Sequence, residues 1–236
     1  MRFVANLAAP VTASVLLWVL GSAPAVAHDV ITTNLTWSQE VSRIVYKHCV
    51  GCHREGGTAP MSLVTYEEAR PWAKAIRDEV LERRMPPWGP VKGVGDFRHD
   101  PSLSQPELDI LVGWVEGGSP KGDEIYLPPV PAAPKAADPP PRGRDLFVAP
   151  SLTLGQSLQI AAIRPRNVPE HGSFEVAAVR PDGAVERLIW IRDFRAKWNR
   201  TYVLAMPVEL PRGARLSVFA AAGASAEITA VAKPAP

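Results

Sequence analysis

Apolar residues recur at helical spacing in three stretches of the N-terminal half of the chain. The first covers residues 36–49, where Val41 and Ile44 mark one apolar face. The same periodicity predicts helices within 65–84 and 104–118. Each stretch opens with a Ser or Thr followed three positions later by Glu or Gln, the capping-box pattern of a helix N-terminus. The N-terminal half is therefore predicted to be helical.

Proline and glycine separate these helices and then divide the chain. Residues 85–103 are rich in both and predict a loop. Residues 127–143 are proline-rich with few core-forming side chains, which is typical of an extended, semi-rigid spacer. Beyond it, short apolar or alternating runs separated by turn residues predict strands, at 157–163, 173–180, 187–194, 201–210 and 215–222. Five or more short strands of this kind indicate a small β-sandwich or barrel.

The pattern as a whole predicts a multidomain chain. We expect an all-α domain over residues 28–126, a linker over 127–143, and a small all-β, sandwich-like domain over 144–232. The lengths of the two parts are each sufficient for an independent core.

The N-terminus carries the pattern of a targeting segment. Arg2 provides a positive charge, residues 7–20 are mostly apolar, and Ala25-Val26-Ala27 fits a signal-peptidase site. The alternative is a retained membrane anchor, but the apolar run is shorter than the roughly 20 residues that a spanning helix needs. We therefore expect a signal peptide over 1–27 that is cleaved, a periplasmic location, and no membrane span in the mature chain.

Charge is distributed unevenly between the two halves. Residues 28–127 hold 11 Lys and Arg against 15 Asp and Glu, whereas residues 128–236 hold 14 against 9. The difference suggests two units with different surfaces. No dense basic cluster with interleaved aromatics is apparent, so the charge gives no reason to expect a nucleic-acid partner.

The only two cysteines of the chain stand in the motif CVGCH, residues 49–53. This is the C-x-x-C-H attachment pattern of c-type haem. Cys49 and Cys52 would form thioethers with the haem vinyl groups, and His53 would be the proximal iron ligand. A structural disulfide and a thioredoxin-like redox pair are the alternatives, but no preceding strand supports the latter.

The residues themselves leave several candidates for the second axial ligand. Met85 is favoured because it follows a predicted helix and precedes two prolines, which stiffen the backbone around it. Met61 is within reach but is expected to pack against the haem edge or helices, and His99 is an outside candidate. Met206 at strand spacing is expected in a core, and His48 at a surface or cap.

The first half resembles a known family. The stretch from "CVGCHREGGTAPMSLVTYEEA" to "RRMPPW", followed by "LSQPELDILVGWVEGG", is similar to class I-type c-type cytochrome domains. It resembles in particular those fused to copper type II, ascorbate-dependent monooxygenase-like modules. The resemblance covers about Thr36 to Asp123. It implies that the methionine of the MPPW loop, Met85, is the distal ligand.

The second half resembles a degenerate version of that monooxygenase-like module. The family has a His-x-His pair after the "IRP" strand, where this chain has Arg166, Asn167 and Val168. His171 is the only histidine nearby, and one imidazole cannot build a stable copper site. The resemblance thus implies a sandwich fold in which copper is not expected.

These observations predict an electron carrier with one covalent haem c, bound through Cys49 and Cys52 and ligated by His53 and Met85. The β-domain would serve as a docking or scaffold module. The expected partners are redox proteins, such as a dehydrogenase or an oxidase. The alternative is an enzyme, a copper monooxygenase-like oxidoreductase in which the haem feeds electrons to the C-terminal domain.

Overall fold

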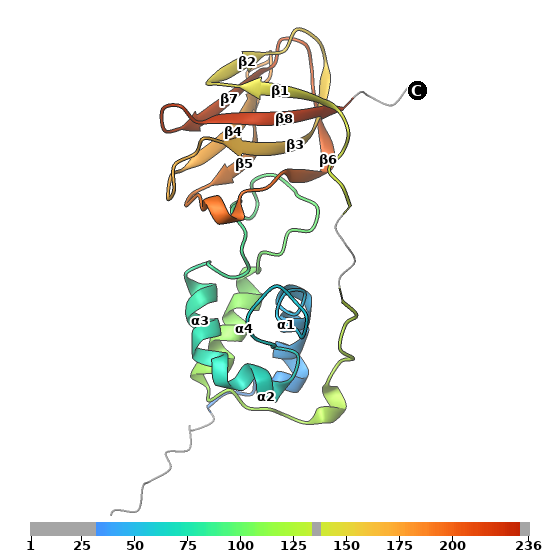
Figure 1. The fold of residues 1–236 in the computed structure, drawn as a ribbon, viewed down its shortest axis with the longest axis vertical. Coiled ribbons are helices and arrows are strands. Elements are labelled where there is room, and N and C mark those ends of the chain that lie inside the picture. The colour runs from blue at the N-terminus through green and yellow to red at the C-terminus, as the bar shows by residue number, and fades with distance from the viewer. Residues whose placement is uncertain (1–31, 134–137, 232–236) are drawn as a thin grey trace, which may run out of the picture. The chain divides into compact units, whose positions relative to one another are not determined.

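The computed structural model of the protein describes residues 32–133 and 138–231 (Figure 1). The signal peptide predicted over 1–27 lies outside these residues. Within the described residues, no helix combines the length and apolar character needed to cross a membrane.

The N-terminal half contains short helices joined by irregular segments. The four α-helices are α1 (Ser42–His48), α2 (Tyr66–Ala69), α3 (Ala73–Leu81) and α4 (Gln105–Glu116). A π-helical turn precedes α1, and 3-10 turns follow α2 and α4, at Trp37–Val41, Arg70–Trp72 and Glu124–Tyr126. The capping boxes predicted for α2 and α4 are confirmed, because Thr65 and Ser104 accept hydrogen bonds from backbone N–H groups that begin each helix.

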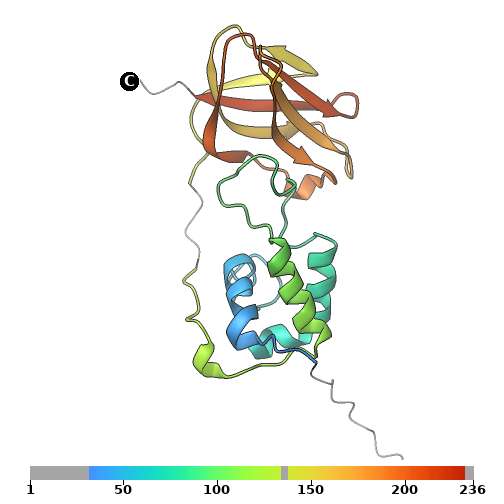
Figure 2. The ribbon, with the colours of Figure 1, turned by 180° about the vertical axis from the view of Figure 1, so that it is seen from behind.

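Two tryptophans form the centre of the helical core. Trp37 and Trp114 are both almost fully buried, with ring centroids 6.1 Å apart. The indole N–H of Trp114 donates to the carbonyl of Pro120 at 3.0 Å, so its polar atom is satisfied inside the core. Helix α4 packs against α3 and the π-helical turn (Figure 2), and this packing fixes the position of α1.

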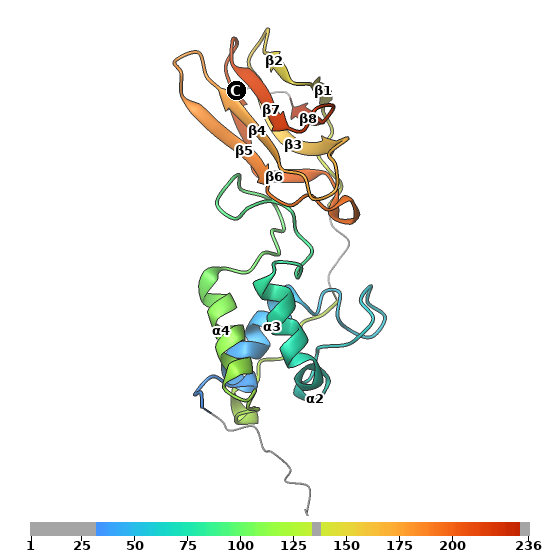
Figure 3. The same cartoon turned by 90° about the vertical axis from the view of Figure 1, so that its left-hand side faces the viewer.

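The C-terminal half is a sandwich of two antiparallel, four-stranded sheets (Figure 3). One sheet has the order β1-β8-β3-β6 and the other β2-β7-β4-β5. The strands are β1 (Arg144–Val148), β2 (Ser151–Thr153), β3 (Leu158–Arg166), β4 (Phe174–Val179), β5 (Val185–Ile191), β6 (Tyr202–Leu210), β7 (Arg215–Ala220) and β8 (Ser225–Val231). Between β5 and β6 lies the 3-10 turn Ala196–Trp198. Inward-facing apolar residues of both sheets form one core.

The segment between α3 and α4 is part of the sandwich. Phe97 is 6% exposed and belongs to the sandwich core, where its backbone forms a bridge with Leu204 of β6. Pro90 forms a second bridge, with Ile191 of β5. The N–H of Val91 donates to a β5 carbonyl at 2.7 Å. The loop predicted at 85–103 is therefore anchored to one strand of each sheet, at Pro90 and at Phe97.

The predicted fold class, an all-α domain followed by a small all-β domain, is wrong. The structure is mostly β, with two four-stranded sheets and only about 23% helical residues in short helices. Helix-breaking residues explain the difference: Pro71 lacks an N–H, and the helix predicted within 65–84 becomes α2, a 3-10 turn and α3. The segments 49–64 and 82–104 contain no helix, and the second of these packs on the sandwich.

Candidate functional site

The two cysteines and His53 lie on a tight turn at the end of α1. The N–H of Cys49 donates to Val45 at 2.8 Å, which completes the last turn of the helix. The N–H groups of Cys52 and His53 both donate to the carbonyl of Cys49, at 3.0 and 2.9 Å. This turn brings all three side chains to one cavity. Both cysteines are free thiols in the structure.

The ring of His53 is oriented by a backbone carbonyl. Its Nδ1 lies 3.3 Å from the carbonyl oxygen of Met61. A carbonyl only accepts hydrogen bonds, so this contact assigns the hydrogen to Nδ1 and leaves Nε2 with a free lone pair. The N–H of Leu63 donates back to the His53 carbonyl at 3.1 Å. His53 is thus held in the tautomer that can ligate a metal through Nε2.

The cavity beside this turn has a volume of about 570 Å³. Cys49, Cys52 and His53 line it together with Met85 and two further groups of residues. The following segment contributes Thr58, Ala59, Pro60, Met61 and Leu63, and the region of α3 contributes Trp72, Ala75, Ile76, Glu79 and Val80. Most of these side chains are apolar, as a macrocycle with a hydrophobic periphery requires. The residues present therefore fit a covalently attached haem.

Met85 lies at the end of α3, on a backbone turn that is held by Glu79. The N–H groups of Arg84 and Met85 both donate to the carbonyl of Glu79, at 2.9 and 3.2 Å. The guanidinium of Arg84 also forms a two-pronged ion pair with the Glu79 carboxylate, at 2.8 and 2.9 Å. The hydrogen bond from Arg84 lowers the pKa of Glu79 below its usual range. The turn that carries Met85 is consequently restrained on one side by α3.

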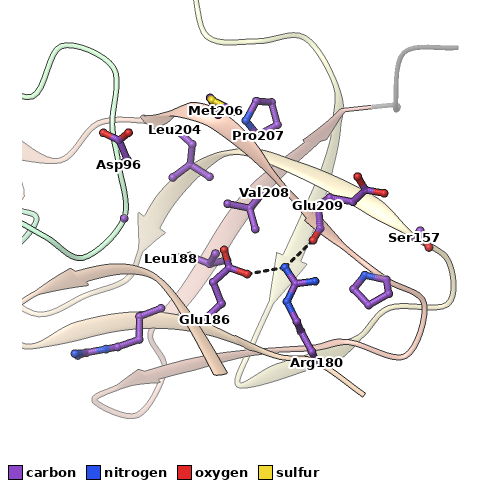
Figure 4. A pocket seen from close by; sticks show the side chains of 13 residues that line it. Asp96, Ser157, Arg180, Glu186, Leu188, Leu204, Met206, Pro207, Val208 and Glu209 are labelled. Carbon is purple, nitrogen blue, oxygen red and sulfur yellow. Dashed lines mark hydrogen bonds and ion pairs between the residues drawn. The ribbon is translucent and has the colours of Figure 1, made fainter. Parts of the chain in front are cut away.

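The structure separates the alternative ligands. Met61 lines the same cavity, but its backbone already orients His53, which places it beside the proximal ligand. His99 is exposed and lines a different cavity with Trp88. The placement of Met206 in a core is wrong, because Met206 is 77% exposed at an edge of the sandwich (Figure 4). Met85 is the methionine that approaches the cavity from beyond α3.

His48 is not the surface residue that the sequence suggested. Its side chain is only 3% exposed. Its Nδ1 lies 2.8 Å from the carbonyl oxygen of Pro101, and its Nε2 lies 3.0 Å from Oε1 of Glu107. Both ring nitrogens are occupied, so His48 has no free atom for iron. His48, the residue before Cys49, thus links the end of α1 to the N-terminal turn of α4.

Glu107 is the acceptor at the centre of this link. Burial raises the pKa of its carboxyl, but hydrogen bonds from Lys47, the N–H of Ser104 and His48 outweigh that effect and hold the pKa well below its usual range. The carboxylate is therefore charged at neutral pH and joins α1 to α4 beside the cavity that Cys49, Cys52 and His53 line.

Burial also affects the thiol of Cys49. It raises the pKa of this thiol to about 12, with a smaller contribution from the neighbouring Cys52. Cys49 is accordingly a protonated thiol at neutral pH, whereas Cys52 is exposed.

His171 is the one histidine among the described residues of the sandwich. His171 is exposed, and its Nδ1 lies 2.8 Å from Oδ1 of Asp193. In the described part of the chain, no three or more His, Cys, Asp or Glu side chains gather as a metal site would require. In the cavity of about 800 Å³ on the sandwich, Arg180 contacts the Glu186 carboxylate and the Glu209 carbonyl (Figure 4).

Comparison of the chain with protein-family models, with curated proteins and with solved structures finds no match. The site therefore rests on its own geometry.

Two features of the site were not predicted from the sequence. The carbonyl of Met61 orients His53, and the backbone of Glu79 holds Met85. A carbonyl contact leaves no trace in residue type, so the first had no sequence signal. The second had a weak one, because Glu79 and Arg84 stand five residues apart with opposite charges at a helix end.

Proposed function

We propose that this protein is an exported electron carrier with one covalently attached c-type haem. Cys49 and Cys52 would bond the porphyrin, Nε2 of His53 would ligate the iron, and the sulfur of Met85 would occupy the opposite axial position. The observation that carries the proposal is one apolar cavity bordered by the CVGCH turn and by Met85.

The haem would supply a one-electron couple, and the chain's own residues would hold and shield it. The carbonyl of Met61 fixes the ring of His53, and the Glu79 backbone restrains the turn that bears Met85. With His53 and Met85 both holding the iron, no ligand position would be left for a substrate. This arrangement favours electron transfer over chemistry on a bound molecule. In this proposal the sandwich acts as a docking or scaffold module for a periplasmic dehydrogenase or oxidase.

The first experiment is expression with a c-type haem attachment system and spectroscopy of the purified protein. Covalent haem remains with the chain on a denaturing gel, and replacing either Cys49 or Cys52 with alanine is expected to weaken that attachment. In Met85→Ala we expect loss of the weak long-wavelength ferric band that marks methionine–iron ligation. Met61→Ala is the matched control and should keep the band.

Metal analysis provides the second measurement. We expect iron close to one per chain and no stoichiometric copper. Copper bound by the sandwich at one per chain would contradict the carrier and support the copper oxidoreductase. Loss of the band in Met61→Ala but not in Met85→Ala would contradict the ligand assignment alone.

A further inference from the structure

A run of basic residues crosses the end of β5 and the turn that follows it. Between residues 187 and 200 the chain holds five Lys and Arg and one acidic residue, Asp193. Most of the excess of positive charge in residues 128–236, 14 Lys and Arg against 9 Asp and Glu, falls within this run, which is a cluster that the sequence-based expectation overlooked. Tryptophans alternate with the cations, at positions 190 and 198.

Two of these five cations are neutralised within the sandwich. Arg187 pairs with Glu175 at 2.6 Å, and Arg195 pairs with Asp193 at 2.8 Å. The other three, Arg192, Lys197 and Arg200, are exposed and have no carboxylate at ion-pair distance among the residues described. Lys197 is near enough to the Glu79 carboxylate to help lower its pKa, but Arg84 already forms an ion pair with that carboxylate. Among the described residues, these three positive charges therefore remain outside any ion pair.

Each of these three cations lies over a tryptophan ring. Arg192 is 5.6 Å from the ring centre of Trp190, Lys197 is 5.7 Å from that of Trp198, and Arg200 is 5.9 Å from that of Trp88. Stacking on a ring limits the motion of a long side chain, so less entropy is lost when a partner binds. Arginine and tryptophan are also the residue types that dominate binding energy at protein interfaces.

These cations border the turn that carries Met85. Arg192 and Trp198 line a cavity of about 650 Å³ whose wall also includes Met85 and Pro86. Nη2 of Arg200 lies 3.4 Å from the carbonyl oxygen of Pro87. A protein bound over these residues would lie beside the distal side of the haem cavity, where an electron has a short path.

We propose that Arg192, Lys197 and Arg200, with the half-buried Trp190 beside them and the buried Trp198 beneath, form a docking surface for a redox protein that presents a cluster of carboxylates. This surface, here called the cationic tryptophan surface, gives the docking role of the sandwich a location, and the proposal rests on the haem function proposed above. In the docked pair, the partner's one-electron centre gains the electron that ferrous haem gives up. No bond forms or breaks, and no proton is transferred.

A protein partner fits this surface better than a nucleic acid does. Three free cations are few beside the roughly 6–10 phosphate contacts of a nucleic-acid-binding protein. Rigid arginine and tryptophan side chains beside a redox site match a small protein interface with a charged periphery.

The test compares two double charge reversals of equal size. Arg192→Glu/Lys197→Glu alters the cationic tryptophan surface. Arg212→Glu/Arg215→Glu is the control, because Arg215 is exposed and pairs in register with Val179, at the opposite end of the same sheet. Six residues of strand separate the two ends, roughly 20 Å. A neutral variant, Arg192→Gln/Lys197→Gln, removes the charges without reversing them, so it still tests the surface if the charge reversal does not fold.

The first readout needs no haem. Fluorescently labelled poly-L-glutamate is titrated with each protein at low and at high salt. We expect the surface reversal to weaken binding by about tenfold at low salt, the neutral variant to fall between, and the control to bind like the parent. High salt should remove the difference. Equal affinity of the surface and control variants would overturn the proposal, and tighter binding of an oligonucleotide of equal charge would assign the surface to nucleic acid instead.

The second readout uses the reduced holoprotein. Oxidation by the anion hexacyanoferrate(III) should slow in the surface reversal relative to the control, and oxidation by the cation tris(phenanthroline)cobalt(III) should accelerate. Unchanged rates with both reagents would show that the surface does not border the electron path. A chain that takes up no haem would refute the proposed function, while the poly-glutamate measurement would still decide the docking surface.

Discussion

Replacing Phe97 with alanine should destabilise the sandwich, although Phe97 lies between two helices of the N-terminal half. Its side chain is 6% exposed within the sandwich core. Truncation of a buried Phe costs about 3–5 kcal/mol. The ring also makes edge contacts with Trp88 and Tyr202, both at 6.0 Å, so the upper part of that range applies. We expect a loss of about 4 kcal/mol in the free energy of unfolding.

Urea unfolding followed by circular dichroism and tryptophan fluorescence measures this loss. With a slope of about 2 kcal/mol per molar urea, the midpoint should fall by about 2 M. Phe219→Ala is the matched control, because Phe219 lies on β7 and is 57% exposed. Its expected cost is below about 1 kcal/mol. A midpoint for Phe97→Ala no lower than that of Phe219→Ala would refute the conclusion that this loop is part of the sandwich core.

Three further predictions concern single residues. Glu107→Gln should lower stability at neutral pH by about 1–3 kcal/mol. The pKa of Glu107 is lower in the folded protein than in the unfolded chain, so its carboxylate stabilises the fold above about pH 4, and this contribution is lost as pH falls. The stability of the variant should therefore change less with pH below about pH 4. Gly95→Ala should lower the urea midpoint of unfolding more than Gly93→Ala does. Both glycines have positive φ, but only a methyl group at Gly95 would meet the Leu188 carbonyl, at 2.3 Å. Equal midpoints for the two variants would contradict the packing of this loop. Burial raises the pKa of Tyr202 to about 12, so alkaline absorbance titration of Tyr202→Phe should lack one late-ionising tyrosine and otherwise match the parent.

The helical segments were predicted to the extent that local signals determined them. The capping boxes at Thr65 and Ser104 formed because the bonds join residues three apart in the sequence. The prediction of an all-α domain was wrong because helical periodicity does not show at which residue a helix ends. Pro71 divided one predicted helix, and no periodicity marked the segment around Phe97 as part of a sheet.

The strands, too, were predicted only where local signals marked them. The runs that became β3 to β7 were visible as short apolar segments. β1, β2 and β8 were missed; β8 alternates small residues that resemble a loop in composition. β1 and β8 pair with each other across more than 80 residues, as Asp145 does with Thr229. Such a pairing depends on register and burial that no local window contains.

The sequence by itself determined the chemistry available to this protein. Two thiols and an imidazole within five residues form a c-type haem attachment motif, and their spacing is a property of one turn of backbone. Only the tertiary structure decided how that chemistry is arranged. It set the tautomer of His53 through the Met61 carbonyl, brought Met85 to the same cavity, and placed Arg192 over the ring of Trp190. These depend on contacts between residues distant in the chain, which form only when the core excludes water and fixes their positions.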